Sequence, residues 1–487
     1  MKPSIFHITR VTLETVTPLS IATGKANGVF DSSLVLDANG LPTIPGSSLT
    51  GVLRHLYQDE HGKADSNELF GYQDHKNSEQ SHSSRLQVSW GYIQDSKGNA
   101  IQGLCLGKQR DAIEKDEILK VALSLAGAPT SRDRVRLNHK GVSADQGKFD
   151  RAVLPAGYRF TVELSLWSAT QNDAQWERVL ALLHHPLFRL GGSTRAGLGR
   201  LKIIEVQKLM ADLTQEKGRN TFNKMQRDIN SRVGFNLRKL SENDNNKIVV
   251  TATLSLTPNS YWRIGQGEKP TLSDSNGKTA DLLPKLEQRI KWKNNNQPEP
   301  AAEYLLIPGS SVKGALSHRI AFHANRFSGL WADDYLEPDE TGKQKDFDKS
   351  EHCDVIQQLF GFASDEQRKG EHKGQAGCVF IDDAYQTFTR TDLQIIMHNS
   401  IDRFSGSVRD HMLFSEEMVW GKDVKLCLTI KKDQNITSIA KKSLQYALND
   451  LCQGRLALGA GVSKGHGFFD GEVIWSDGGK WIQGAAE

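Results

Sequence analysis

The chain carries one ordered set of sequence signals twice, once in each half. Alternating apolar residues run into Thr17-Pro18 in the first half and into Thr257-Pro258 in the second, as expected for strands with one buried face. Ile-Pro-Gly-Ser-Ser then begins at Ile44 and again at Ile307, and apolar residues at helical spacing follow each time. Such duplication predicts two copies of one domain, because unrelated segments rarely share several signals in one order.

The later signals of the two copies lie a constant 268 residues apart, as Gly191 and Gly459 do. A helical pattern leads into a glycine-rich loop in both copies, and a strand pattern follows. We name residues 191–199 the first loop and residues 459–467 the second loop. The order strand, helix, inserted strands, strand, helix, loop, strand is that of a ferredoxin-like βαββαβ unit. We therefore expect an α+β protein built from two tandem ferredoxin-like, RRM-like domains.

The expected domains span residues 1–210 and 248–487, and residues 211–247 are polar enough to form a linker. Each copy also contains a long polar segment, with Asp133-Arg134 in the first and Asp402-Arg403 in the second. Residues 131–151 hold six Lys or Arg against three Asp, and their excess of three positive charges equals the net charge of +3 of the whole chain. We predict that both segments form hairpin arms, although charge runs of this kind also occur on ordinary solvated faces. A serine of each Ile-Pro-Gly-Ser-Ser motif is expected to cap the following helix.

Composition excludes several classes of protein. None of the five cysteines forms a CxxC pair, so neither a zinc knuckle nor a disulfide framework is indicated. The N-terminus lacks an apolar leader, and no stretch approaches the roughly 18 apolar residues of a membrane span. We expect a cytoplasmic protein without a membrane partner. The small net charge permits nucleic-acid binding only where basic side chains cluster.

Taken together, Pro-Gly-Ser-Ser before a helix, Leu-Phe-Gly, an Asp-Arg arm and a glycine-rich loop resemble the RAMP superfamily of CRISPR systems. Each half is similar to the backbone subunit of type III effectors, and the segment from Asp31 to Ser48 is especially similar, because that subunit commonly has an aspartate in a loop ahead of the motif. The chain thus resembles a fused double backbone subunit. The resemblance implies a palm that binds guide RNA and a thumb hairpin that interrupts the guide-target duplex. It also implies four partners: guide RNA, target RNA, other RAMP backbone subunits and a large signalling subunit.

The resemblance further implies metal-dependent cleavage of target RNA, with Asp31 as the catalytic and metal-binding residue. An aspartate can hold Mg²⁺ or another divalent ion, or position a ribose 2′-hydroxyl for attack on the adjacent phosphate, so that the RNA supplies its own nucleophile. In the second copy Asp281 is the first choice for this role and Asp274 the next. An aspartate in such a loop is also common in ordinary turns, so each has a purely structural alternative.

Guide binding is expected at the loops, at the helix starts and along the arms. Glycines and helix N-termini let backbone N–H groups approach a phosphate without reading the base, while basic side chains add charge. Helix capping explains the serines equally well, and a tight turn is the more common explanation of a single glycine-rich loop, so only the duplication favours RNA binding at the loops. The residues expected to contact RNA are Ser47, Ser48, Arg54, Arg134, Arg136, Gly192, Arg195, Gly197, Gly199, Ser310, Ser311, Lys313, Arg403, Arg409, Lys464, Gly465 and His466.

Two other functions fit the same sequence. A non-catalytic assembly subunit would hold guide RNA while other subunits cut. A guide-processing endonuclease of the same superfamily would use a histidine as general base, and His55, His318 and His323 lie on the helices after the Ile-Pro-Gly-Ser-Ser motifs.

Overall fold

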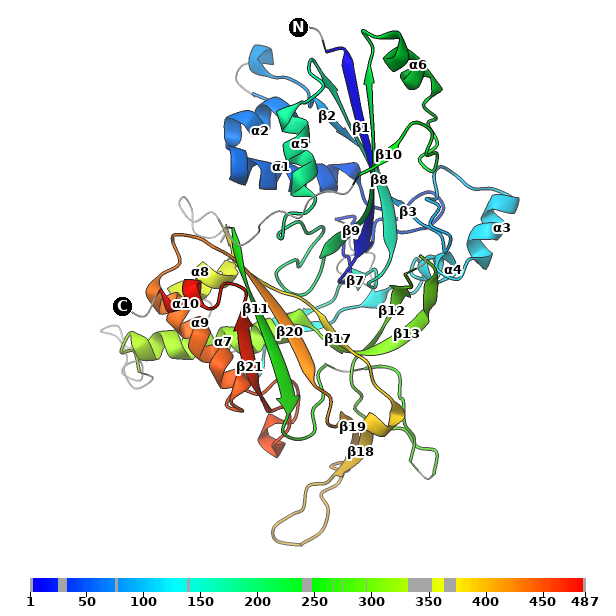
Figure 1. The fold of residues 1–487 in the computed structure, drawn as a ribbon. Coiled ribbons are helices and arrows are strands. Elements are labelled where there is room, and N and C mark those ends of the chain that lie inside the picture. The colour runs from blue at the N-terminus through cyan, green and yellow to red at the C-terminus, as the bar shows by residue number, and fades with distance from the viewer. Residues whose placement is uncertain are drawn as a thin grey trace.

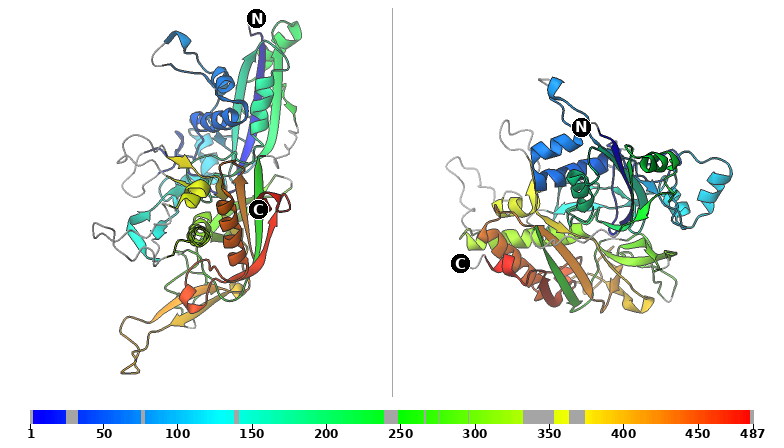
Figure 2. Two further views of the ribbon diagram at one scale, coloured as in Figure 1. Left: turned by 90° about the vertical axis from the view of Figure 1, so that its left-hand side faces the viewer. Right: turned by 45° about the horizontal axis from the view of Figure 1, so that its top comes forward.

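The computed structural model describes residues 3–24, 33–74, 78–137, 141–238, 248–265, 267–274, 276–294, 296–331, 353–362 and 374–484. We call residues 3–238 the first repeat and residues 248–484 the second repeat. The two repeats lie one above the other, with the first uppermost in Figure 1 and in both views of Figure 2. Helices and antiparallel sheets alternate along the chain, which confirms the predicted α+β class.

The first repeat is built on an antiparallel sheet with the strand order β10-β9-β1-β8-β2, and β3 also pairs with β8. The alternating pattern of β1 places Val11 between Val162 of β8 and Val206 of β9. All three valines are buried, as are Leu49 and Trp176 of the helices α1 and α5. The elements are β1 (Ile5–Thr15), α1 (Gly46–His61), α2 (Lys63–Phe70), β2 (Leu86–Val88), β3 (Tyr92–Ile93), α3 (Lys108–Lys115), α4 (Leu119–Ser124), β4 (Thr130–Ser131), β5 (Arg134–Leu137), β6 (Ser143–Phe149), β7 (Ala152–Val153), β8 (Arg159–Ser168), α5 (Ala174–Leu182), β9 (Leu201–Asp212), α6 (Glu216–Lys224) and β10 (Asn236–Leu237).

The second repeat has a four-stranded sheet with the order β16-β20-β11-β21. Leu254 of β11 pairs with Leu426 of β20 and Val473 of β21, and helices α7, α8 and α9 contribute to the core. Counted along the chain, the four main strands take the same order in both sheets, with the first strand between the third and fourth. The elements are β11 (Val249–Pro258), β12 (Leu286–Trp292), β13 (Pro298–Ile307), α7 (Gly309–Phe327), α8 (Asp354–Phe360), β14 (Gly361–Phe362), β15 (Gln375–Ala376), β16 (Val379–Ile381), β17 (Ala384–Gln386), β18 (Leu393–His398), β19 (Phe414–Val419), β20 (Val424–Lys431), α9 (Ser438–Cys452), β21 (Phe469–Trp475) and α10 (Lys480–Gln483).

Both polar segments contain hairpins outside the main sheets. Strands β5 and β6 pair with each other in the first repeat, and β18 pairs with β19 in the second. Figure 1 shows the β18–β19 hairpin projecting from the lower end of the molecule. We call residues 131–151 the first arm and residues 393–419 the second arm.

The predicted serine caps are wrong. Helix α1 begins at Gly46 after Pro45, and helix α7 begins at Gly309 after Pro308, without a side-chain cap from the preceding residue. At α7 a carboxylate distant in the sequence takes this role, because the Gly309 N–H donates to Oδ1 of Asp383 at 2.7 Å. Proline fixes the entry into each helix, and the serines lie within the first turn.

The described part of the predicted linker packs on the first repeat. Strand β9 continues to Asp212, α6 follows, and β10 pairs with β9. Phe222 of α6 contacts Phe6 edge to face, with ring centroids 5.3 Å apart. The polar composition of this segment suggested a linker, because only a few apolar residues form the packing contacts. In the described part of the chain, no helix is long and apolar enough to cross a membrane.

Candidate nucleic-acid interface

The two repeats meet where the first loop lies against the beginning of α7. Asp382 and Asp383 of the second repeat are buried there and receive arginines from the first repeat. Arg189 forms an ion pair with Asp382, and Nη1 of Arg200 lies 2.8 Å from its other carboxylate oxygen. A backbone bridge also joins Gly197 to Asp382. Because unpaired buried charges are costly, these contacts fix how the first loop sits on the second repeat.

Asp383 belongs to a second buried cluster at the same junction. Nη2 of Arg132 lies 2.9 Å from Asp383 and 2.7 Å from Glu287, so one guanidinium serves two carboxylates. Burial raises the pKa of Asp383 to about 6, and the nearby Glu287 acts in the same direction against the opposing charge of Arg132. Burial opposes the charged form of Arg132, but the two carboxylates raise its pKa above the ordinary value. The cluster therefore combines a permanent cation with a carboxyl group whose pKa is raised by burial.

A cavity of about 540 Å³ opens beside this junction and is lined by both repeats. Arg134 and Lys148 line it from the first arm, Leu198 from the first loop, and Ser310 and Ser311 from the first turn of α7. The structure thus brings three of the predicted RNA contacts, from two different repeats, into one site. The sequence did not predict that Arg134 and the serines line one cavity, because they lie far apart along the chain.

Three partly buried cations, Arg134, Arg195 and Lys313, lie near one another where the first loop meets α7, and Arg134 also lines the cavity. Arg134 donates from Nη1 to Oγ of Ser193 at 2.9 Å and from Nη2 to the carbonyl oxygen of Ala196 at 3.3 Å. Arg195 donates from Nε to the carbonyl oxygen of Gly377 at 2.5 Å. These bonds anchor both guanidinium groups beside the first loop.

The charged form of each of the three cations is disfavoured. Burial lowers the pKa of Arg134 to about 10, and it also lowers the pKa of Arg195. Burial lowers the pKa of Lys313 as well, and repulsion from Arg195 and Arg134 adds to this shift. An anion placed among the three would relieve both costs. A phosphodiester suits such a site, because its negative charge is permanent.

Some of the predicted glycine contacts have a structural explanation. A Cβ added at Gly199 would lie 2.1 Å from the carbonyl oxygen of Leu190. At Gly197 an added Cβ would meet the buried Asp383, whereas at Gly192 it would meet only the guanidinium of Arg151, the movable end of a long side chain. Gly465 differs, because an added Cβ there meets nothing within 4 Å and φ is +82°. Of these glycines, Gly465 leaves its backbone most accessible to a ligand.

The second loop lies over a buried acidic side chain that sequence patterns did not identify. Nζ of Lys464 lies 2.8 Å from Glu416 of β19, and Nη2 of Arg263 lies 3.1 Å from its other oxygen. Nε2 of His398 lies 3.2 Å from Glu416, and its ring centroid is 6.5 Å from that of His466. Burial lowers the pKa of His466. The second loop and the base of the second arm therefore form one charged unit.

Asp281 lies at the edge of this unit, because it bonds to the residue before Glu416. Its carboxylate accepts from the backbone N of Ser415 at 2.8 Å and from Oγ of Ser415 at 2.9 Å. The hydrogen bond from the Ser415 backbone is the main cause that lowers the pKa of Asp281. Asp274 instead accepts from the backbone N of Asn276 and of Lys278, as a turn aspartate does. Asp281 is thus held by a residue far away in the sequence, whereas Asp274 bonds to the backbone of its own turn.

Asp281 offers a single carboxylate to the predicted divalent ion. One ionised, exposed carboxylate fits Mg²⁺, which is usually bound by one or two carboxylates together with substrate phosphates. No group of three or more His, Cys, Asp or Glu side chains suited to hold a metal occurs among the described residues. Asp31 lies outside the described residues.

The remaining predicted contacts lie on the surface or near it. Ser47 is exposed and Ser48 is half-buried at the start of α1, while Arg54 donates to Oδ1 of Asn67 at 2.9 Å. Arg136, Arg403 and Arg409 are exposed on the arms. His323, a candidate base for guide processing, is buried and lies 2.7 Å from Asp450. Its burial and its hydrogen bond to Asp450 disfavour contact with RNA.

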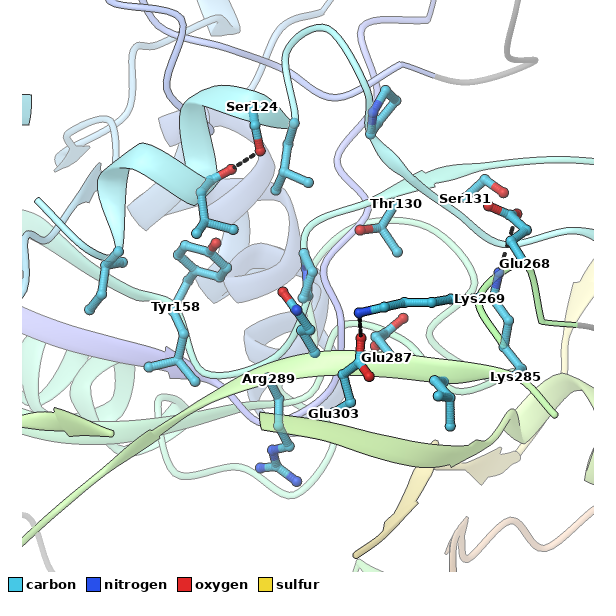
Figure 3. A pocket seen from close by; sticks show the side chains of 18 of the residues that line it. Ser124, Thr130, Ser131, Tyr158, Glu268, Lys269, Lys285, Glu287, Arg289 and Glu303 are labelled. Atoms are coloured by element: carbon cyan, nitrogen blue, oxygen red, sulfur yellow. Dashed lines mark hydrogen bonds and ion pairs between the residues drawn. The ribbon is translucent and has the colours of Figure 1, made fainter. Parts of the chain in front are cut away.

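A larger cavity of about 790 Å³ lies between the two repeats, below α4 and against the β12–β13 hairpin. Figure 3 shows Lys269 reaching across it to Glu303, with Glu287 close by. Nζ of Lys269 lies 2.6 Å from Glu303. None of the predicted RNA contacts lines this cavity, and its several glutamates make it unsuited to a phosphate.

Comparison with known proteins places most of the chain in one family. A family model described as the RAMP superfamily matches residues 12–202 and 255–470, one region in each repeat. No curated protein matches. Among solved structures, the chain is similar to a chain of "Cryo-EM structure of the Type III-B Cmr-beta bound to cognate target RNA". That match has a TM-score of 0.28 and 14% identity and covers 42% of this chain and 60% of the other.

Proposed function

Because the chain belongs to the RAMP superfamily, we propose that it is a fused double backbone subunit of a type III CRISPR effector. Both repeats are then ferredoxin-like domains, each with an inserted thumb hairpin. The strand order shared by the two sheets supports this assignment, since it is the order expected of a βαββαβ unit. The domain limits remain those expected from the sequence, with residues 211–238 packed on the first.

Guide RNA is the proposed ligand of the junction between the repeats. The observation that carries this proposal is the cluster of Arg134, Arg195 and Lys313 beside a cavity that both repeats line. These cations would contact backbone phosphates, and the serines of α7 would add hydrogen bonds. Contacts of this kind ignore base identity, which suits a subunit whose specificity comes from base pairing.

Target RNA is the proposed substrate, cleaved beside a nucleotide displaced by an arm. Asp31 would hold Mg²⁺ or another divalent ion in the first repeat, and Asp281 would do so in the second. When bound, the ion would stabilise the negative charge that develops on the phosphate. In the second repeat the bonds from Ser415 fix the Asp281 carboxylate and favour its ionised form. The guide, the target, other backbone subunits and a signalling subunit are the proposed partners.

A non-catalytic role is the second candidate. The hydrogen bonds of Asp281 are consistent with this role too, because they already engage the carboxylate within the repeat. Guide binding is common to both candidates, and only target cleavage separates them.

Guide binding at the junction can be tested by the salt dependence of RNA affinity. Replacing Arg134 and Lys313 with alanine should reduce the slope of log affinity against log salt by about 1.4, because each lost phosphate contact removes about 0.7 on single-stranded RNA. Filter binding at several salt concentrations measures this slope. Lys217→Ala, on the exposed face of α6, is the control. An unchanged slope in the folded double variant would contradict binding at the junction.

A further inference from the structure

The cavity of about 790 Å³ against the β12–β13 hairpin has the size of a small-molecule site. We call it the hairpin cavity. Ile118, Leu125 and Tyr158 line it from the first repeat, and Leu286 and Ile290 line it from the second. These side chains are buried or half-buried, and the backbone N–H of Ile290 bonds to the first repeat. The cavity therefore has apolar walls that the contact between the repeats holds in place.

One polar group inside the hairpin cavity lacks a partner in the protein. The Tyr158 residue is only 2% exposed, yet its hydroxyl forms no hydrogen bond within the part of the chain that the structure describes. Figure 3 shows this side chain pointing into the cavity. Burial raises the pKa of Tyr158 well above its ordinary value, so the hydroxyl stays protonated. Because buried polar groups normally have a partner, a ligand group or water is expected to bond to this hydroxyl.

The cations that line the hairpin cavity are already paired or turned away. Nζ of Lys269 lies 2.6 Å from Glu303, and Nζ of Lys285 lies 3.7 Å from Glu268. Figure 3 shows Arg289 turned away from Lys269, and its guanidinium lies 4.8 Å from the ring centroid of a tyrosine. The lining therefore offers no cation that would favour an anionic ligand.

Two acids of the lining are left without a compensating charge. Glu117 and Glu299 are exposed at the cavity and form no ion pair among the described residues. Lys291, which lies opposite Glu299 in the hairpin, is instead 4.9 Å from the ring centroid of a tyrosine. Glu287, another acid of the lining, is paired with Arg132 of the first repeat. The cavity thus combines apolar walls with an excess of negative charge.

We propose that the hairpin cavity binds a linear polyamine, whose ammonium groups pair with Glu117 and Glu299 and bond to the Tyr158 hydroxyl, while its methylene groups cover the apolar walls. A neutral apolar ligand would leave the buried hydroxyl without a partner, which is costly. A divalent metal ion would need several oxygen ligands and bound water in place of apolar walls. Only a cation with apolar segments meets all three features of the lining. The proposal goes beyond the proposed function and does not depend on RNA binding.

Isothermal titration calorimetry with spermidine tests the site on the full chain, freed of RNA because RNA binds polyamines itself. The double variant Glu117→Gln with Glu299→Gln should weaken binding about tenfold, because two ion pairs are lost. Tyr158→Phe keeps the ring and should weaken binding about fivefold through one lost hydrogen bond. Glu114→Gln with Glu472→Gln is the matched control, since it removes the same charge from exposed positions outside the cavity.

Hydrogen exchange locates the bound spermidine independently of affinity. Spermidine should slow exchange in α4 and β12, which line the cavity, and should raise the Tm of the chain. Mg²⁺ at equal ionic strength should not displace it, because the metal ion cannot cover apolar walls. Absence of binding at millimolar spermidine, displacement by Mg²⁺, or equal affinity in the cavity variants and the control would each overturn the proposal. An unchanged salt slope in the Arg134 and Lys313 variant would not affect these results, so the two proposals fail separately.

Discussion

Asp383 shows how one residue links the repeats. Its carboxylate caps α7 through the Gly309 N–H and faces the Arg132 guanidinium from the other repeat. The same carboxylate blocks a side chain at Gly197, since an added Cβ there would lie 1.8 Å from Oδ1. The Asp383 side chain therefore contacts the start of α7, the first loop and the first arm at once.

The raised pKa of Asp383 gives a testable dependence of stability on pH. Burial raises this pKa from about 3.8 to about 6, so at intermediate pH the folded protein holds a proton that the unfolded chain has released. The resulting stabilisation is fully present below the unfolded pKa and is lost as pH rises through 6. Between pH 4.5 and 7.5 the unfolding free energy of the protein, relative to that of Asp383→Asn, should fall by about 2 kcal/mol.

Urea unfolding of both proteins across this range, followed by tryptophan fluorescence, measures that difference. Other carboxyl groups titrate in both proteins and cancel in the comparison. A difference that stays constant with pH would show that the Asp383 carboxyl does not titrate in this window.

At the scale of elements, the two glycine-rich loops have similar backbone conformations at equivalent glycines, but their surroundings differ. Gly197 and Gly465 occupy equivalent positions, with φ of +111° and +82°. Gly197 is buried against Asp383, whereas Gly465 faces open space. The first loop is therefore part of an interface within the chain, and the second loop is available to a ligand.

Alanine at these two positions should separate the roles of the loops. Gly197→Ala should lower the unfolding free energy by about 3 kcal/mol, because it adds a clash with Asp383 to the strain of positive φ. Gly465→Ala should cost about 1 to 2 kcal/mol from backbone strain alone. Chemical denaturation of both variants measures the costs, and each serves as the control for the other. Equal destabilisation would contradict the difference in environment.

Much of the element order was predictable because it depends on short-range patterns. Alternation at Val250, Ala252, Leu254 and Leu256 predicted one buried face of β11, and all four residues are buried. Helical spacing after Ile44 predicted α1. The serine caps failed because Pro45 and Pro308 set the helix starts and because Asp383 reaches α7 through tertiary packing. No local pattern encodes a cap contributed from so far along the chain.

At the scale of the whole molecule, duplication predicted the two sheets but not their junction. Repeat comparison emphasises positions that the copies share, whereas the junction consists of positions where they differ. Because Ile44 bridges to Gly91 as Ile307 pairs with Ala384, Asp382 and Asp383 correspond to Ser89 and Trp90. Arg189 corresponds to Ala457 at the spacing of 268 residues. The buried Glu416 cluster was likewise missed, since its members His398, Arg263 and Lys464 are brought together only by the second arm and second loop.

Cleavage of target RNA is the central claim for the whole molecule, and mapping the fragments of a labelled target on a denaturing gel tests it directly. Assemblies containing Asp31→Ala should bind target normally but lose the fragment from one position, because a metal-positioning carboxylate stabilises the transition state more than the bound target. Asp281→Ala should remove a second fragment, Asp274→Ala should remove neither, and both cuts should require a divalent ion. Wild-type fragments at the wild-type rate from the Asp31→Ala and Asp281→Ala assemblies would contradict catalysis by this chain and leave it a guide-binding assembly subunit.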